Sequence, residues 1–175
     1  MKRSLALLIL SASLALGLLS ACTQHSPAGP NPGAIVPGEG IAEVQLFDSR
    51  QEVEAALGAP PIVSDNPFNK EHVIVQYPQR GLEISYLRDT VGSIVLYSSG
   101  LKDGVQWVAY QGSTKEGIWP DSKAATIKTK LGQPYKELPQ AYVYNGLWVR
   151  LDDEGGVESF SISKDEVSQL ESLNI

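Results

Sequence analysis

The stretch SRQEVEAALGAP at residues 49–60 decides the expected fold, because it returns in altered form as SKAATIKTKLGQP at residues 122–134. In the first copy, Ser49 and Glu52 have the spacing of a capping box, in which two side chains satisfy free backbone N–H groups at a helix start. Val53 and Leu57 then share one helical face, and Gly58 suits the left-handed conformation that ends a helix. The first copy therefore predicts a short helix that ends at Gly58.

The second copy carries the same signals in the same order. Asp121 or Ser122 is expected to cap its helix, and Gly132 is expected to end it. The apolar stripe of this helix consists of Ala124, Ile127 and Leu131. A helix of about ten residues is marginal in water, so each of the two is expected to pack on a sheet.

Three further pairs of motifs recur in the same order along the chain. They are EGI at 39–41 and 116–118, DS at 48–49 and 121–122, and GL at 81–82 and 146–147. The copies lie 65 to 77 residues apart, so the order is kept while the loop lengths differ. A repeated order of motifs indicates a duplicated structural unit.

Runs rich in β-branched and aromatic residues follow each helix and predict antiparallel strands. They occupy residues 73–77, 82–87, 94–97 and 105–110 in the first copy, and 142–144, 147–151 and 157–162 in the second. The expected fold class is therefore α+β. It consists of two tandem units, at 41–112 and 113–175, each a short helix packed on an antiparallel three- to four-stranded sheet. The second unit is expected to close with a short C-terminal helix.

The first 22 residues indicate export and lipidation. Lys2 and Arg3 precede an apolar run at 5–19, which is short for a membrane span but suits a cleaved signal peptide at 1–21. The sequence LSAC at 19–22 resembles the lipobox of bacterial lipoproteins, in which Cys22 is lipidated. The alternative is an ordinary signal peptide with a chance cysteine. Residues 22–40 are expected to form a lipidated Pro/Gly-rich tether.

Charge and anchoring set the expected location and partners. Removal of Lys2 and Arg3 with the signal peptide leaves 12 of 14 basic residues against 20 acidic ones, a net charge of -8. An acidic chain without a basic stripe is not expected to bind nucleic acid. The acyl chains on Cys22 would hold the membrane. The expected location is the cell envelope, at the periplasmic face of an outer membrane or otherwise at the outer face of the cytoplasmic membrane.

Catalytic and metal-binding patterns are sparse. A single cysteine excludes an intramolecular disulfide and a Cys-rich metal site. His72 has no accompanying catalytic motif and is interpreted as structural. The run DDEGG at 152–156 has the pattern of a hairpin turn and lacks the alternating carboxylates of a calcium loop. We therefore expect no enzyme activity, no cofactor, no metal site and no catalytic residue.

The repeated unit resembles a known lipoprotein family. A helix ending in Leu-Gly-x-Pro, followed by a hairpin entered through Gly-Leu, is similar to the SmpA/OmlA (BamE-like) family of outer-membrane assembly lipoproteins. The residues that carry the resemblance are Gly117-Ile118, Asp121-Ser122, Leu131-Gly132, Pro134 and Gly146-Leu147, with their first-copy counterparts. The unit in tandem resembles the β-lactamase-inhibitor-protein fold. These resemblances imply a protein-binding role at the cell envelope.

Four residues are candidates for contact with a protein partner of unknown identity. Tyr142, Tyr144, Trp148 and Arg150 are of types enriched at interface hot spots. The alternative is that the two tyrosines pack in the core while Trp148 shields the sheet. The expected function is a membrane-anchored, non-catalytic protein-binding module, such as an outer-membrane assembly or scaffold accessory similar to BamE. The alternatives are an inhibitor-like binder of a secreted enzyme, such as a β-lactamase or protease, and a small-ligand-binding lipoprotein.

Overall fold

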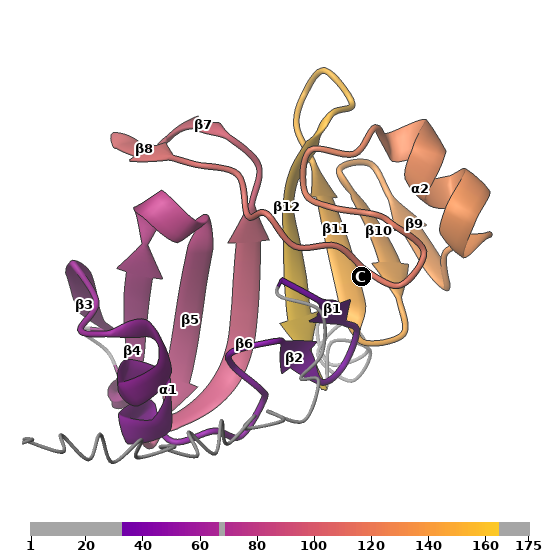
Figure 1. Cartoon of the computed structure of the whole chain (residues 1–175). Coiled ribbons are helices and arrows are strands. Elements are labelled where there is room, and N and C mark those ends of the chain that lie inside the picture. The colour runs from indigo at the N-terminus through magenta and orange to yellow at the C-terminus, as the bar shows by residue number, and fades with distance from the viewer. Residues whose placement is uncertain (1–32, 67–68, 165–175) are drawn as a thin grey trace, which may run out of the picture.

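The computed structural model describes residues 33–66 and 69–164 of the chain (Figure 1). The expected signal peptide, the lipidation site at Cys22 and the expected C-terminal helix lie outside the described residues. Within the described part, no helix is long and apolar enough to cross a membrane.

One antiparallel sheet of eight strands organises the described residues (Figure 1). Its strands, in spatial order, are β3 (Ile62–Asn66), β4 (Asn69–Tyr77), β5 (Leu82–Leu87), β6 (Thr90–Tyr97), β12 (Val157–Ser163), β11 (Leu147–Leu151), β10 (Ala141–Tyr144) and β9 (Lys136–Leu138). At its centre β6 pairs with β12, so that Leu96 lies opposite Phe160 and Ile94 opposite Ile162. This central pairing makes a single sheet out of two runs of four strands.

The fold class expected from the sequence is wrong. The expectation was two units, each with a short helix on its own three- to four-stranded sheet, whereas the described chain is mostly β and has one continuous sheet with two short α-helices. The physical reason lies in the exposed edges. Two separate sheets would leave β6 and β12 with unpaired backbone groups, and pairing them removes both edges at once. Local sequence patterns carry no signal for this long-range pairing.

Both α-helices pack on the same face of the sheet (Figure 1). The first, α1 (Arg50–Leu57), starts at the predicted capping box, in which Ser49 Oγ accepts from the Glu52 N–H at 3.3 Å and Glu52 Oε2 accepts from the Ser49 N–H at 2.8 Å. The second, α2 (Ala124–Leu131), begins after Lys123 with no side-chain cap.

The caps expected for α2 are used elsewhere. Asp121 accepts a hydrogen bond from the Ser99 N–H at 3.3 Å, and Ser122 Oγ accepts one from the Trp119 N–H at 3.1 Å. Both side chains therefore hold the loop before the helix in place, and Lys123 takes the N-cap position by default.

The core lies between this sheet face and the helices. Val53 and Leu57 of α1 and Ile127 of α2 are buried against it. The strands contribute Val75, Tyr77, Leu82, Ile84, Tyr86, Val91, Ile94, Leu96, Leu147, Val149, Phe160 and Ile162. Because alternate residues of a strand point to opposite faces, these residues also determine which side chains lie on the other face.

Residues 33–40, which the sequence placed in the tether, join the fold. They form a small hairpin from β1 (Ile35–Val36) and β2 (Gly40–Ile41), and Ile35 is only 2% exposed. Its backbone N–H donates to the Ser113 carbonyl at 2.9 Å. A Cβ on Gly146 would lie 2.4 Å from the Gly38 nitrogen, so the two segments can cross this closely because residue 146 is glycine. Part of the glycine content thus serves close packing as well as chain freedom.

Candidate protein-binding surface

The sheet face opposite α1 and α2 carries the side chains that alternate with the core residues. We call it the open face and define it by His72, Ile74, Gln76, Glu83, Ser85, Val95, Tyr97, Ser161, Trp148 and Arg150. All of these except the exposed Arg150 are partly buried, and Ala141, Val143 and Ser159, which the register places on the same face, are fully buried. An antiparallel sheet with helices on one side commonly leaves the other side available to solvent or a partner.

Trp148 and Arg150 lie on the open face, as neighbours two residues apart on β11. Trp148 is opposite Ser161 and Arg150 is opposite Ser159 on β12. The Arg150 side chain is 63% exposed, and its Nε lies 3.8 Å from Glu158 Oε2, a loose ion pair. Such an exposed pair contributes little to stability, so the guanidinium is available for a partner.

The indole N–H of Trp148 is buried and has no hydrogen-bond acceptor within the described residues. An indole can only donate, and a buried donor without an acceptor carries an energetic penalty. A partner that supplies an acceptor after a small rotation of the ring would remove that penalty.

Tyr97 links this region to the other half of the sheet. Its ring stacks on Trp107 with centroids 4.1 Å apart and planes tilted by 36°. Trp107 is 3% exposed and comes from the hairpin of β7 (Gly100–Lys102) and β8 (Val105–Trp107). The Tyr97 hydroxyl donates to Glu83 Oε2 at 3.4 Å, and the Gln76 amide donates to the same oxygen at 2.8 Å.

The electrostatics of Tyr97 show which groups surround it. Burial raises the pKa of its phenol, and the Glu83 carboxylate raises it further, while Arg150 lowers it. The Arg150 guanidinium of β11 and the Tyr97 phenol of β6 therefore act on each other across β12. Sequence reasoning placed residues 94–97 and 105–110 in strands but assigned no role to Tyr97 or Trp107. Tyr97 alternates with the buried Leu96, and this alternation was the sequence signal that could have placed Tyr97 on the open face.

The two predicted tyrosines lie on the opposite face, against α2. Tyr142 pairs with Val149, a core residue, and the Lys128 ammonium lies 4.4 Å from the centre of its ring. The Tyr144 hydroxyl donates to the Gly132 carbonyl at 3.3 Å. The structure thus separates the four candidates, with Trp148 and Arg150 on the open face and both tyrosines holding the helix.

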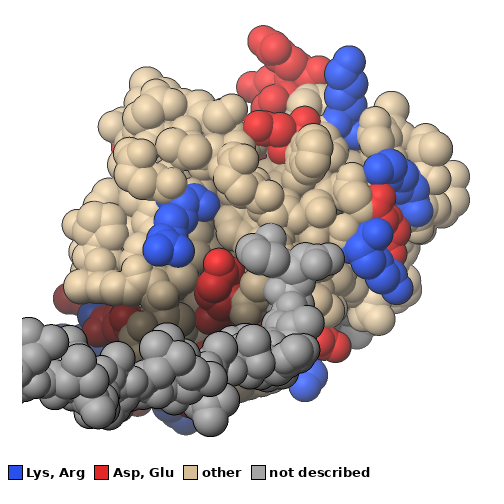
Figure 2. Space-filling model, viewed as in Figure 1, with Lys and Arg blue, Asp and Glu red and all other residues tan. Residues whose placement is uncertain are grey.

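The residues considered for catalysis and metal binding have structural partners. His72 Nε2 lies 2.6 Å from Ser85 Oγ on the neighbouring strand. Asp152 Oδ1 accepts from the N–H groups of Glu154 and Gly156 at 2.9 and 2.7 Å, which closes the turn between β11 and β12. Figure 2 shows acidic side chains gathered at the top of the molecule, over this turn. Among residues 33–66 and 69–164, no group of three or more His, Cys, Asp or Glu could hold a metal ion.

No family model matches the chain, and neither a curated protein nor a solved structure matches it.

Proposed function

We propose that this chain is a cell-envelope lipoprotein, anchored through Cys22, that binds another protein on the open face without catalysing a reaction. The observation that carries the proposal is the gathering of Trp148, Arg150 and Tyr97 on one face that neither α-helix covers. Tryptophan, tyrosine and arginine are the residue types most enriched at binding hot spots.

The rigidity and the side-chain composition of the open face favour a protein partner. The side chains stand on paired strands of a continuous sheet, so a partner meets a preorganised surface and little conformational entropy is lost on binding. Aromatic and aliphatic groups are mixed with Gln76, Glu83 and Arg150, the combination found where an apolar centre is bordered by polar groups.

The proposed anchor limits where that partner is met. Between Cys22 and Gly33, the first described residue, the chain can span at most about 40 Å when fully extended. The open face would therefore work close to the membrane surface. This favours a membrane-associated partner, and hence an assembly or scaffold accessory similar to BamE, over an inhibitor of a freely diffusing enzyme.

The test compares what co-purifies with the tagged, lipidated full-length protein from detergent-solubilised membranes, identified by mass spectrometry. The variants Trp148→Ala and Arg150→Ala are each expected to weaken the complex by about 2 kcal/mol, which is about thirtyfold in affinity. Arg88→Ala is the matched control, because it removes an arginine of similar exposure whose partner is Glu71 and not an open-face residue.

The identity of the captured protein decides between the alternatives. Recovery of outer-membrane barrel machinery would support the assembly accessory, and recovery of one soluble enzyme whose turnover is blocked would support the inhibitor. Retention of every partner by both open-face variants, at wild-type affinity, would refute the proposed surface.

A further inference from the structure

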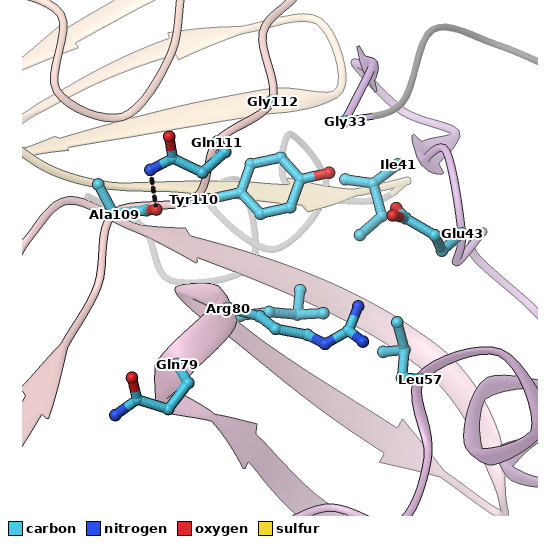
Figure 3. Close-up of a pocket in the computed structure, with 11 residues that line it drawn as sticks. Gly33, Ile41, Glu43, Leu57, Gln79, Arg80, Ala109, Tyr110, Gln111 and Gly112 are labelled. Carbon is cyan, nitrogen blue, oxygen red and sulfur yellow. Dashed lines mark hydrogen bonds between the residues drawn. The ribbon is translucent and has the colours of Figure 1, made fainter.

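A cavity of about 310 Å³ opens on the helix side of the sheet, between the end of α1 and the segment after β8 (Figure 3). Its apolar wall consists of Ile41, Leu57, Leu82, Ala109 and the ring of Tyr110. Its polar groups are Glu43, Gln79, Arg80 and Gln111. The volume is near the lower limit of small-molecule sites, which span about 300–1,000 Å³.

Tyr110 contributes its ring to the cavity wall and keeps its hydroxyl buried. The residue is 9% exposed, and its hydroxyl has no hydrogen-bond partner within the described residues. Figure 3 shows this hydroxyl directed toward Ile41 and Glu43. Burial and the charge of Glu43 both raise the pKa of the phenol, so it stays protonated and able to donate. The hydroxyl itself is enclosed, so a molecule in the cavity meets the ring of Tyr110 and not its hydroxyl.

Glycines at positions 112 and 81 allow close approaches around Tyr110 in this wall. A Cβ on Gly112 would lie 1.6 Å from the Gly33 carbonyl oxygen and 2.3 Å from a ring carbon of Tyr110. A Cβ on Gly81 would lie 2.4 Å from the Tyr110 nitrogen. Only glycine fits at these crossings, so the wall is rigid and the cavity is built into the fold.

The mouth of the cavity carries one positive and one negative side chain. Arg80 comes from the 3₁₀ turn η1 (Pro78–Arg80), and Figure 3 shows it reaching along the cavity toward Leu57. The Glu43 carboxylate lies beside Ile41 in the same view. The ion pairs within residues 33–66 and 69–164 involve neither Arg80 nor Glu43, so both charges are free to meet a ligand.

We propose that this cavity binds a free α-amino acid with an apolar side chain of leucine to phenylalanine size. The side chain would lie on the apolar wall, the carboxylate would accept from Arg80, and the ammonium group would donate to Glu43. This site is on the opposite side of the sheet from the open face and goes beyond the proposed protein binding.

The two charges select a zwitterion over simpler ligands. A fatty or aromatic acid would satisfy Arg80 but meet the like charge of Glu43, and an apolar amine would meet the like charge of Arg80.

The experiment is a calorimetric titration of the full-length protein in detergent with four compounds. L-leucine and L-phenylalanine are the expected ligands, whereas 3-phenylpropanoate lacks the ammonium group and phenethylamine lacks the carboxylate. Both analogues are expected to bind at least about tenfold more weakly than phenylalanine, because each loses one charge-assisted interaction.

Two variants locate the site. Arg80→Gln is expected to weaken phenylalanine binding at least about tenfold, and Glu43→Gln to abolish the discrimination against 3-phenylpropanoate. Arg88→Gln, an exposed arginine outside the cavity, is the control and should bind as the wild type does. Unfolding of each variant without ligand checks that the fold is intact.

Absence of a binding signal for both amino acids at about 10 mM would overturn the proposal. Equal affinities of the Arg80→Gln and Arg88→Gln variants, or of phenylalanine and 3-phenylpropanoate for the wild type, would overturn it too. The Trp148→Ala variant should keep amino-acid binding, so failure at this cavity is distinguishable from failure of the open face as a protein-binding surface.

Discussion

The hydroxyl of Tyr77, the last residue of β4, donates a 3.0 Å hydrogen bond to the carbonyl of Gly58, the residue that ends α1. The second half of the chain has the same arrangement, with the Tyr144 hydroxyl at the end of β10 donating to the Gly132 carbonyl after α2. Each of these two hydrogen bonds, called a tie below, joins the end of a helix to a strand of the sheet. The repeated Leu-Gly motif therefore marks a specific contact as well as a helix stop.

Replacement of Tyr77 by phenylalanine tests this tie. Tyr77→Phe should lower the free energy of unfolding by about 1 kcal/mol, because the Gly58 carbonyl loses its donor. Tyr86→Phe is the matched control, since the Tyr86 hydroxyl is buried with no partner within the described residues and its removal should leave stability unchanged or raised. Urea unfolding measures both. Equal losses for the two variants would show that the tie does not stabilise the fold.

The glycine that ends α1 should be sensitive to any side chain. Gly58 has φ 83° and ψ 174°, a backbone region that is essentially restricted to glycine. Gly58→Ala should therefore lower the free energy of unfolding by about 1–3 kcal/mol, although a Cβ there would contact nothing within 4 Å.

Gly92→Ala is the control for that substitution. Gly92 lies within β6, outside the left-handed region, and a Cβ would approach the Ser85 carbonyl oxygen at an ordinary 3.7 Å. Alanine there should leave the denaturation midpoint unchanged or raise it. A Gly58→Ala protein as stable as Gly92→Ala would contradict the strain argument.

The two helices differ at their N-termini, and substitutions should act in opposite directions. Ser49→Ala removes the cap of α1 and should lower the free energy of unfolding by about 1 kcal/mol. Lys123→Asp places a capping carboxylate at the start of α2, which has no side-chain cap, and should raise it by about 0.5–1 kcal/mol. Thermal unfolding with circular dichroism measures both changes. A loss of stability in Lys123→Asp would show that α2 cannot accept a cap in this loop geometry.

Acid should weaken the start of α1 through Glu52. Hydrogen bonds from the Ser49 backbone and then from its side chain hold the pKa of Glu52 below its ordinary value of 4.5. Because the folded pKa is below the unfolded one, the contribution to stability is complete above pH 4.5 and is lost as the pH falls through the folded pKa.

Glu52→Gln keeps a residue that suits the capping box but does not titrate. Its unfolding free energy should therefore fall less steeply between about pH 5 and pH 3 than that of the wild type. Unfolding curves at several pH values measure the two slopes, and parallel slopes would contradict the role given to Glu52.

Two residues of the open face could be predicted from alternation within one strand. Leu147, Val149 and Leu151 point to the core, so Trp148 and Arg150 had to share the other face. The faces of Tyr142 and Tyr144 were harder to assign, because they depend on the register between β10 and β11. Pairing of Tyr142 with Val149 turns both tyrosines toward α2, and a shift of one residue would have turned them outward.

The sequence by itself determined the features that neighbouring residues control: the capping box at Ser49, the helix ends at Gly58 and Gly132, and the alternation along β11. The tertiary structure alone decided the pairing of β6 with β12, the burial of Ile35 and the separation of the four candidate binding residues. The physical reason is the range of the interactions. Caps and turns are settled within a few residues, whereas strand pairing depends on backbone edges and apolar faces that meet only after the chain has folded.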